Sequence, residues 1–267
     1  MSADERAADA PGQWTAWHED RLRRVTAPYG PLSVTGTLWL DDAVDGRLDD
    51  VPGRWRVDGD ALVVQAEAGD GLTLDGEPFA GEVRLAVHEG GPGASRLAHR
   101  RCRLVPMRRE GLWAVRVFDP EAKARTAFDG IDVFDHDARY TLPAVFRPYD
   151  AEQHVQVPNA DGVARGIGLA GELVFTLDGQ ERTLKAGVED GGGLFVVFAD
   201  ATSGRTSYRF RFQRTAAPAA DGSVTVDFNR AQLPPCAFTS HFLCPFPPPG
   251  NRLDVAVPAG ERDVASA

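Results

Sequence analysis

The spacing of apolar residues changes near residue 30. Before that point, after a polar, Ala-rich start, four large apolar side chains recur at roughly helical spacing: Trp14, Trp17, Leu22 and Val25. We therefore expect one substantial helix, in a region 1–28 that comprises a polar tail and this helix. From Leu32 onward the helical period is replaced by short strand-like runs, for example at 32–40, 172–177 and 194–199.

Turn signals separate most of these runs. Nine Asp-Gly dipeptides occur, beginning at Asp45, Asp58, Asp70, Asp75, Asp129, Asp161, Asp178, Asp190 and Asp221. Asp-Gly suits tight hairpin turns because both residues tolerate positive backbone φ angles. Many short strands without intervening helical patterns exclude a doubly wound sheet and favour antiparallel sandwiches or barrels.

A change of composition near residue 110 suggests a boundary between two β units. The segment before it is basic and rich in glycine, whereas 112–120 opens a new strand. We expect a first β unit at 29–110 and a second at 111–267. Seven prolines between Pro234 and Pro258 cannot donate ladder hydrogen bonds. The predicted fold is therefore mainly β, with two packed antiparallel units (sandwich or barrel-like), one N-terminal helix and a Pro-rich C-terminal strap.

Composition narrows the classes of partner. The chain has 267 residues, of which 43% are hydrophobic and 25% charged, and its net charge is −10. A negative chain disfavours nucleic acid, which requires concentrated positive potential. No apolar run approaches the roughly 18 residues of a membrane span, and no targeting signal precedes the helix. We expect a cytoplasmic protein with a small-molecule ligand and no membrane partner; nothing indicates its oligomeric state.

One motif matches the sequence pattern of a dinucleotide-binding site. Residues 166–171 read G-x-G-x-x-G, but a strand-like run follows them, whereas the dinucleotide fingerprint requires a helix there. We interpret these glycines as structural and expect no cofactor. No G-x-S-x-G or H-E-x-x-H motif is present in the sequence.

Cys236, His241 and Cys244 form a C-x4-H-x2-C cluster within the Pro-rich segment. We do not expect a metal, because a structural zinc site needs a fourth ligand and a suitable spacing. A nucleophilic thiol is the second interpretation, since nearby cations lower a thiol pKa. Packing of buried thiols is the third and is favoured over catalysis. A Cys236–Cys244 disulfide remains an alternative, although the few cysteines and a reducing cytosol favour thiols.

Polar side chains concentrate in the same segment, which we call the C-terminal signature (residues 226–261). They are Asp227, Asn229, Arg230, Asn251, Arg252 and Glu261. Arginine side chains bind carboxylates and phosphates through paired hydrogen bonds, so this set predicts an anion site. The alternative is that the same groups satisfy the segment's own backbone, for instance with Arg230 paired to Asp227 or Glu261. A second polar cluster, Asp200 to Gly204 followed by Tyr208, fits either a turn or part of the site.

At these residues the chain resembles a prokaryotic family called domain of unknown function 1684. The resemblance covers most of the chain. The matching residues of the signature are Asp227 to Ala231, Pro234 to Phe238, Cys244 and Pro245, Pro247 to Pro249, Asn251 to Leu253, and Ala259 to Glu261. Upstream, the matching positions are Trp39, Arg116, Asp119, Arg125, Phe128, Asp200, Ser203, Gly204 and Tyr208.

The family brings no general activity with it, but the resemblance favours the interpretation that the polar set forms a site. This chain departs from the family pattern at Gln232, Leu233 and His241, and it has 209–211 (Arg-Phe-Arg) in place of a Gly-rich run. If these positions line a pocket, the hypothesis is that this chain has a changed substrate or has lost activity on the usual substrate of the family.

Three functions follow from these features. The first is an enzyme acting on a small polar or acidic metabolite at a pocket lined by the signature. Its ligand-binding residues would be Asn229, Arg230, Asn251, Arg252, Asp200 and Tyr208, and its catalytic candidates Cys236, His241, Cys244 and Glu261. The second is a non-catalytic β module that binds a ligand or a protein. In the third, the signature has a purely structural role and only holds the two β units together.

Overall fold

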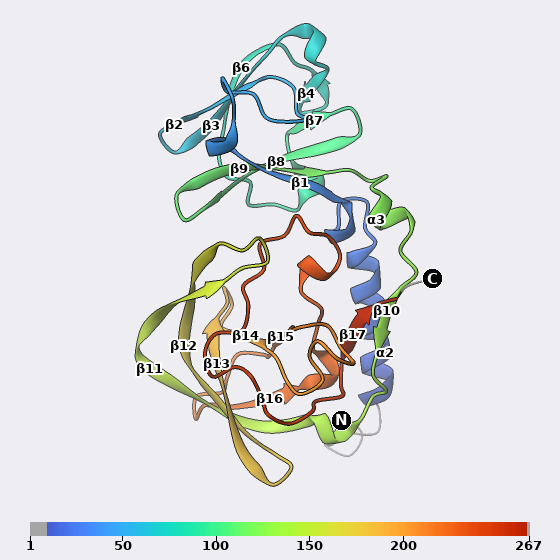
Figure 1. Ribbon diagram of the computed structural model, residues 1–267, viewed down its shortest axis with the longest axis vertical. Helices are drawn as coiled ribbons and strands as arrows, with labels where there is room; N and C mark the ends of the chain where they lie inside the picture. Colours follow the sequence, from blue (N-terminus) through green and yellow to red (C-terminus); the bar gives the residue numbers. More distant parts are fainter. Residues whose placement is uncertain (1–9, 266–267) are drawn as a thin grey trace. The chain divides into compact units, whose positions relative to one another are not determined.

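The computed structural model describes residues 10–265, and the predicted polar tail therefore lies largely outside the described residues. Within this range, the chain divides into two compact units (Figure 1). The middle unit is Arg23–Phe128, and the C-terminal unit combines the chain up to Leu22 with the chain from Asp129 onward. The break after Phe128 corrects the expected boundary at residue 110.

The predicted N-terminal helix is confirmed as α2, Ala10–Val25. Arg23 and Arg24 lie in its last turn, where positive charge opposes the negative end of the helix dipole. A single further α-helical turn within residues 10–265 is α3, Lys123–Thr126. Short 3-10 turns are η1 (Pro31–Ser33), η2 (Leu40–Asp42), η3 (Ala68–Asp70), η4 (Pro92–Ala94), η5 (Ala138–Tyr140), η6 (Phe228–Arg230) and η7 (Pro235–Ala237).

The middle unit contains two antiparallel sheets. A six-stranded sheet has the order β1-β9-β8-β7-β4-β5, and a three-stranded sheet has the order β2-β3-β6. The strands are β1 (Val34–Trp39), β2 (Arg54–Asp58), β3 (Ala61–Ala66), β4 (Leu72–Leu74), β5 (Glu77–Pro78), β6 (Gly81–Leu85), β7 (Leu97–His99), β8 (Cys102–Arg109) and β9 (Leu112–Phe118). Residue 110 lies in the tight turn between β8 and β9, which pair along their full length. A boundary there would divide a hairpin.

The C-terminal unit contains a curved six-stranded sheet that forms a half-barrel, with the order β15-β14-β13-β12-β11-β16 (Figure 1). Its strands are β11 (Thr141–Pro158), β12 (Ala164–Leu177), β13 (Gln180–Val188), β14 (Leu194–Phe198), β15 (Arg211–Arg214) and β16 (Ser223–Asp227). A separate pair joins β10 (Ile131–Val133) to β17 (Glu261–Val264), beside α2 in Figure 1. The mainly β, antiparallel prediction is confirmed.

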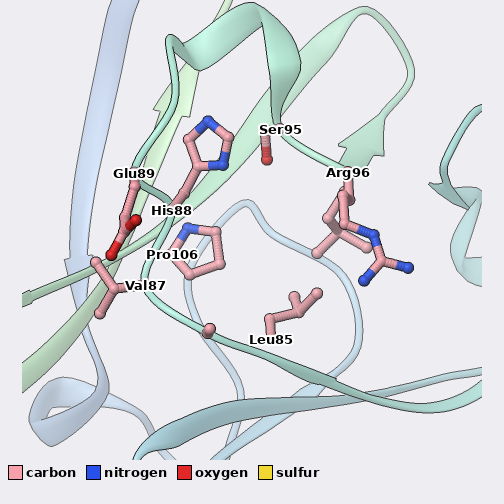
Figure 2. A pocket seen from close by; sticks show the side chains of 9 residues that line it. Leu85, Val87, His88, Glu89, Ser95, Arg96 and Pro106 are labelled. Atoms are coloured by element: carbon pink, nitrogen blue, oxygen red, sulfur yellow. The ribbon is translucent and has the colours of Figure 1, made fainter.

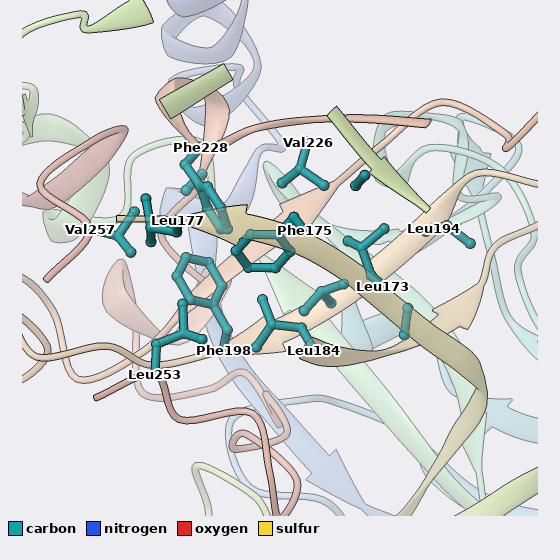
Figure 3. Packing of buried hydrophobic residues seen from close by; sticks show 14 of the residues in the cluster. Leu173, Phe175, Leu177, Leu184, Leu194, Phe198, Val226, Phe228, Leu253 and Val257 are labelled. Carbon is teal, nitrogen blue, oxygen red and sulfur yellow. The ribbon is translucent and has the colours of Figure 1, made fainter. Parts of the chain in front are cut away.

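The core of the C-terminal unit joins the sheet to the signature (Figure 3). Phe175 of β12 and Phe228 of the signature meet edge to face, with ring centroids 5.5 Å apart. Phe198 of β14 packs against the same Phe228 ring at 5.4 Å. Apolar side chains from Val226 to Val257 complete this cluster, so burial of the signature contributes to the core itself.

One of the predicted Asp-Gly turns shows the positive backbone φ angles that this dipeptide permits. Asp178 and Gly179 connect β12 to β13 in a two-residue hairpin, with φ angles of 53° and 73°.

The G-x-G-x-x-G stretch lies inside β12, which confirms that it is not a dinucleotide loop. Among residues 10–265, no helix is long and apolar enough to cross a membrane.

Candidate functional site

The signature is held to the sheet mainly through its backbone. Between η7 and β17 it forms no regular strand, and its contacts with neighbouring chain are single bridges. The Ala199 N–H donates to the Asn251 carbonyl at 2.9 Å, and Leu253 N–H donates to the Ala199 carbonyl at 2.8 Å. Because prolines interrupt the donors, polar side chains must satisfy the remaining backbone groups.

Asn251 satisfies the backbone of two strands. Its Oδ1 accepts from Lys185 N–H at 2.7 Å, and its Nδ2 donates to the carbonyls of Lys185 and Val197 at 2.8 and 2.9 Å. The side chain is fully buried. Asn251 therefore joins β13, β14 and the signature and faces no solvent-connected space.

Asn229 also satisfies backbone groups of another segment, at the other end of the signature. Its Oδ1 accepts from Asp137 N–H at 2.9 Å, and its Nδ2 donates to the Asp137 carbonyl at 3.0 Å. Its own carbonyl accepts from Trp14 Nε1 at 2.7 Å. The residue is fully buried. Asn229 thus connects the signature to η5 and to helix α2.

Glu261, a predicted catalytic group, is completely buried in an ion pair. Arg21 Nε of helix α2 donates to Glu261 Oε1 at 2.9 Å, and Leu233 N–H donates to Oε2 at 2.6 Å. A second nitrogen of Arg21 donates to the Leu233 carbonyl at 3.0 Å. Sequence reasoning missed Arg21, because no local pattern links residues 240 positions apart.

Asp200 is likewise paired inside the protein. Arg211 donates to Asp200 Oδ2 at 2.5 Å, and both side chains have no exposed surface. Arg211 also donates to the carbonyls of Val257, at 2.9 Å, and Ala259. Burial lowers the pKa of Arg211, and the charge of Asp200 opposes that shift. This pair anchors the end of the signature to β15.

The two arginines predicted as anion anchors are not gathered into one site. Arg230 lies with its Nε 3.3 Å from Asp227 Oδ2, as the structural alternative expected. Arg252 is exposed and contributes only backbone to the bridge with Ala199.

Three of the predicted site residues do come together: Tyr208 and Cys244 both contact Cys236. The Cys236 N–H donates to Cys244 Sγ at 3.3 Å. The Tyr208 hydroxyl lies 3.2 Å from the Cys236 carbonyl oxygen and 3.7 Å from Cys236 Sγ, within hydrogen-bond reach of both. Cys244 is buried and Cys236 is partly exposed. We call Tyr208, Arg209, Cys236 and Cys244 the thiol cluster.

The electrostatics of the thiol cluster favour a thiolate. Hydrogen bonding with Cys244 lowers the pKa of Cys236 to about 7, with further help from Tyr208 and Arg209 and against the effect of burial. Burial, together with the neighbouring Cys236, raises the pKa of Tyr208 to about 12, so its hydroxyl keeps its proton at neutral pH. A thiolate beside a hydroxyl donor and a guanidinium is an activated nucleophile.

Aromatic rings surround this cluster. The Arg209 guanidinium lies 4.6 Å from the centroid of Phe246 and 5.6 Å from that of Phe210. Phe242 packs against a cluster of apolar residues that includes both thiols. In the sequence Arg209 was marked only as a departure from the family pattern, and no local pattern indicated its position near the thiol.

His241, the third member of the C-x4-H-x2-C cluster, is partly buried, and this burial lowers its pKa. In the described part of the chain, no group of three or more His, Cys, Asp or Glu side chains could hold a metal ion. All three cysteines lie among the described residues, and no disulfide joins them.

A separate cavity of about 440 Å³ lies in the middle unit (Figure 2). It is lined by Leu85 to Glu89, Ser95 to Leu97, and Pro106. His88 Nε2 lies 2.9 Å from the Gly91 carbonyl, and the Ser95 hydroxyl donates to the Leu104 carbonyl at 2.6 Å. The cavity combines apolar walls with a few polar groups, as small-molecule sites do.

Fold and site together define a mainly β protein whose C-terminal signature contains two neighbouring cysteines, one of them beside Tyr208. The chain belongs to the family described as protein of unknown function DUF1684, whose model matches residues 126–262. This match covers the C-terminal unit rather than most of the chain.

The chain is similar to an uncharacterised protein of Haloarcula marismortui, known from a solution NMR structure, with 36% sequence identity. The similarity covers 52% of this chain and 78% of that chain, with a TM-score of 0.44. A comparison with curated proteins found no match.

Proposed function

We propose that this protein is a thiol-dependent enzyme that acts on a small polar or acidic metabolite, with Cys236 as its nucleophile. The observation that carries the proposal is the convergence of Tyr208 and Cys244 on a partly exposed Cys236. The other titratable candidates are engaged elsewhere: Glu261 and Asp200 are fully buried in ion pairs.

Each member of the thiol cluster has a chemical role in this proposal. The Cys236 thiolate attacks an electrophilic atom of the substrate. The Tyr208 hydroxyl, held near the sulfur, donates a proton to the leaving group. Exposed Arg209 supplies positive charge for an anionic substrate group, a role that the sequence had suggested for Arg230 and Arg252.

Alkylation with iodoacetamide tests the nucleophile. Cys236 should react with a pH midpoint at about 7. Cys102 is the matched control, because it is also a partly exposed thiol but burial raises its pKa. Peptide mapping should find Cys236 alkylated about tenfold faster than Cys102 at neutral pH. Equal rates at the two thiols would sink the proposal.

Turnover is tested with a panel of small acids, esters and amides. Cys236→Ser should abolish any turnover found, while Cys102→Ser should leave it unchanged. Both variants are checked by thermal unfolding, so that loss of fold is separated from loss of the nucleophile. Activity that survives in Cys236→Ser contradicts the proposed role.

The middle-unit cavity supports a second candidate function, a non-catalytic module that binds a small ligand. Val87 lines this cavity and is 40% exposed, so Val87→Glu would place a charge at the site without disturbing the core. Val57→Glu in β2 is the control, because Val57 is 47% exposed and lies outside the cavity lining. A ligand whose binding is lost in the first variant and kept in the second would favour this function.

A further inference from the structure

Cys236 and Cys244 are held beside each other by independent anchors. Cys236 lies in the 3-10 turn η7, and its carbonyl lies 3.2 Å from the Tyr208 hydroxyl. The Cys244 carbonyl accepts from Ala160 N–H at 2.9 Å, where the signature meets the β11–β12 hairpin. The two cysteines therefore do not depend on the intervening loop for their proximity.

The contact between them suits a bond between the sulfurs. A disulfide requires Cβ atoms roughly 3.5–4.5 Å apart. Here the Cys236 backbone N–H donates to Cys244 Sγ at 3.3 Å, and the neighbouring Cys244 thiol lowers the pKa of Cys236. The Cys244 sulfur is thus already in contact with the residue to which the bond would join it.

We propose that Cys236 and Cys244 are a redox pair that reduces a hydroperoxide, with Cys236 attacking the peroxide and Cys244 resolving the oxidised product. This goes beyond the proposed function: it rests on Cys236 as the nucleophile but assigns to it a different substrate class, a hydroperoxide. A second thiol in contact with the first has no necessary role in simple acyl transfer, whereas a two-thiol reduction requires one.

The reaction balances in two steps. The Cys236 thiolate attacks the terminal oxygen of R–O–O–H, the O–O bond breaks, and Cys236 becomes a sulfenic acid while the alkoxide RO⁻ leaves. Tyr208 donates a proton to the alkoxide, giving ROH, and is reprotonated by water. The Cys244 sulfur then attacks the Cys236 sulfur, forming the disulfide and releasing water. Two equivalents of a low-molecular-weight thiol restore both cysteines and become its disulfide.

The surroundings of the pair favour an organic hydroperoxide. Phe242 and Phe246 belong to the apolar cluster that contains both thiols, and they suit an apolar R group. The guanidinium of Arg209, over the Phe246 ring, can stabilise the negative charge that develops on the departing oxygen.

The test uses the full chain, reduced and then freed of reductant. One equivalent of cumene hydroperoxide should lower the number of titratable thiols from three to one, leaving Cys102. Peptide mapping by mass spectrometry should identify a Cys236–Cys244 disulfide in the wild-type protein. Cumyl alcohol should form in an equal amount. Retention of all three thiols, or a disulfide that involves Cys102, overturns the inference.

Variants separate the two thiols. Cys244→Ser should accumulate a sulfenic acid at Cys236, which dimedone traps. Cys236→Ser should consume peroxide only at the slow rate of the Cys102 thiol. Cys102→Ser should behave as the wild type. If Cys244→Ser does not fold, the mapping of the wild-type protein still decides the question.

The alkylation experiment distinguishes the two proposals. Fast alkylation of Cys236 without peroxide reduction leaves the thiol-dependent enzyme standing and removes the redox pair. Slow alkylation together with no peroxide reduction removes both. Peroxide reduction at a rate about tenfold above that of Cys102 supports the pair whether or not another metabolite is turned over.

Discussion

Arg21 of helix α2 donates from Nε to Glu261 Oε1 at 2.9 Å, so the first described helix is tied to the last described strand. Glu261 has no exposed surface, and the side chain of Arg21 is 11% exposed. The pair lies at the point where the signature ends and β17 begins. Glu261 is therefore positioned to hold the C-terminal unit together, not to transfer protons to a substrate.

Removal of this pair should destabilise the protein. Glu261→Ala leaves the Arg21 charge and the Leu233 N–H without their acceptor, and loss of one member of a buried pair costs about 3–5 kcal/mol. Urea unfolding at neutral pH measures the change. Arg23→Met, on an exposed position of the same helix, should change the free energy of unfolding by less than about 1 kcal/mol. A stable but inactive Glu261→Ala variant would instead restore Glu261 as a catalytic candidate.

The Asp200–Arg211 pair should behave as a coupled unit. Asp200→Asn leaves the Arg211 charge uncompensated in the core and should cost about 3–5 kcal/mol. The double variant Asp200→Leu with Arg211→Met removes both charges and should be more stable than Asp200→Asn. A double-mutant cycle with Asp200→Leu and Arg211→Met as its single changes, measured by chemical unfolding, tests the coupling. Additive effects of the two single changes would show that the charges are not coupled.

Asn251 and its neighbour Arg252 offer a matched comparison. Asn251→Ala leaves two carbonyls and one N–H of β13 and β14 without their hydrogen-bond partner, at a cost of about 1–3 kcal/mol for each buried group. Arg252→Ala changes an exposed side chain and should leave the melting temperature nearly unchanged. Thermal unfolding of the two variants distinguishes them. The reverse order would mean that Arg252 makes a structural contact.

Tyr208→Phe should raise the pH at which Cys236 becomes reactive. The hydroxyl helps to lower the pKa of Cys236, so its removal should move the alkylation midpoint upward from about 7. The thermal stability should remain close to that of the wild type, because the ring is kept. An unchanged midpoint would show that Tyr208 does not act on the thiol.

The same pKa predicts how stability depends on pH. The pKa of Cys236 is lower in the folded chain than its ordinary value of 9.0, so the unfolded chain binds more protons between pH 7 and 9. Its contribution is complete above pH 9 and is lost as the pH falls through about 7. The free energy of unfolding of the wild type, relative to Cys236→Ser, should therefore increase from pH 7 to pH 9. A flat difference would contradict the lowered pKa.

Much of the fold was predictable from local patterns. The helical spacing before residue 30 and the Asp-Gly turns depend on neighbours a few positions apart, and both are confirmed at α2 and at Asp178. The boundary at residue 110 was wrong for a related reason. The tight turn at Glu110 and Gly111 has the same local character as a linker, and only pairing of β8 with β9 identifies it as a hairpin.

The site was less predictable, because its residues are distant in sequence. Tyr208 approaches Cys236 across 28 positions, and Arg209 had no pattern that marked it as a neighbour of the thiol. The sequence showed that polar residues concentrate in the signature, but the partners of Asn229, Asn251 and Glu261 lie on distant segments of the chain, including β13, β14 and α2. A sequence indicates that such side chains need partners and does not state which ones.

The sequence by itself determined the antiparallel β class, the N-terminal helix and the importance of the signature, since periodicity, turn chemistry and proline content act locally. Only the tertiary structure decided which groups are buried. Burial gave Asn229, Asn251, Glu261 and Asp200 closed networks of partners, and it left Cys236 partly exposed beside Cys244 and Tyr208. The reactivity of a thiol depends on the charges and donors around it, and folding alone assembles those.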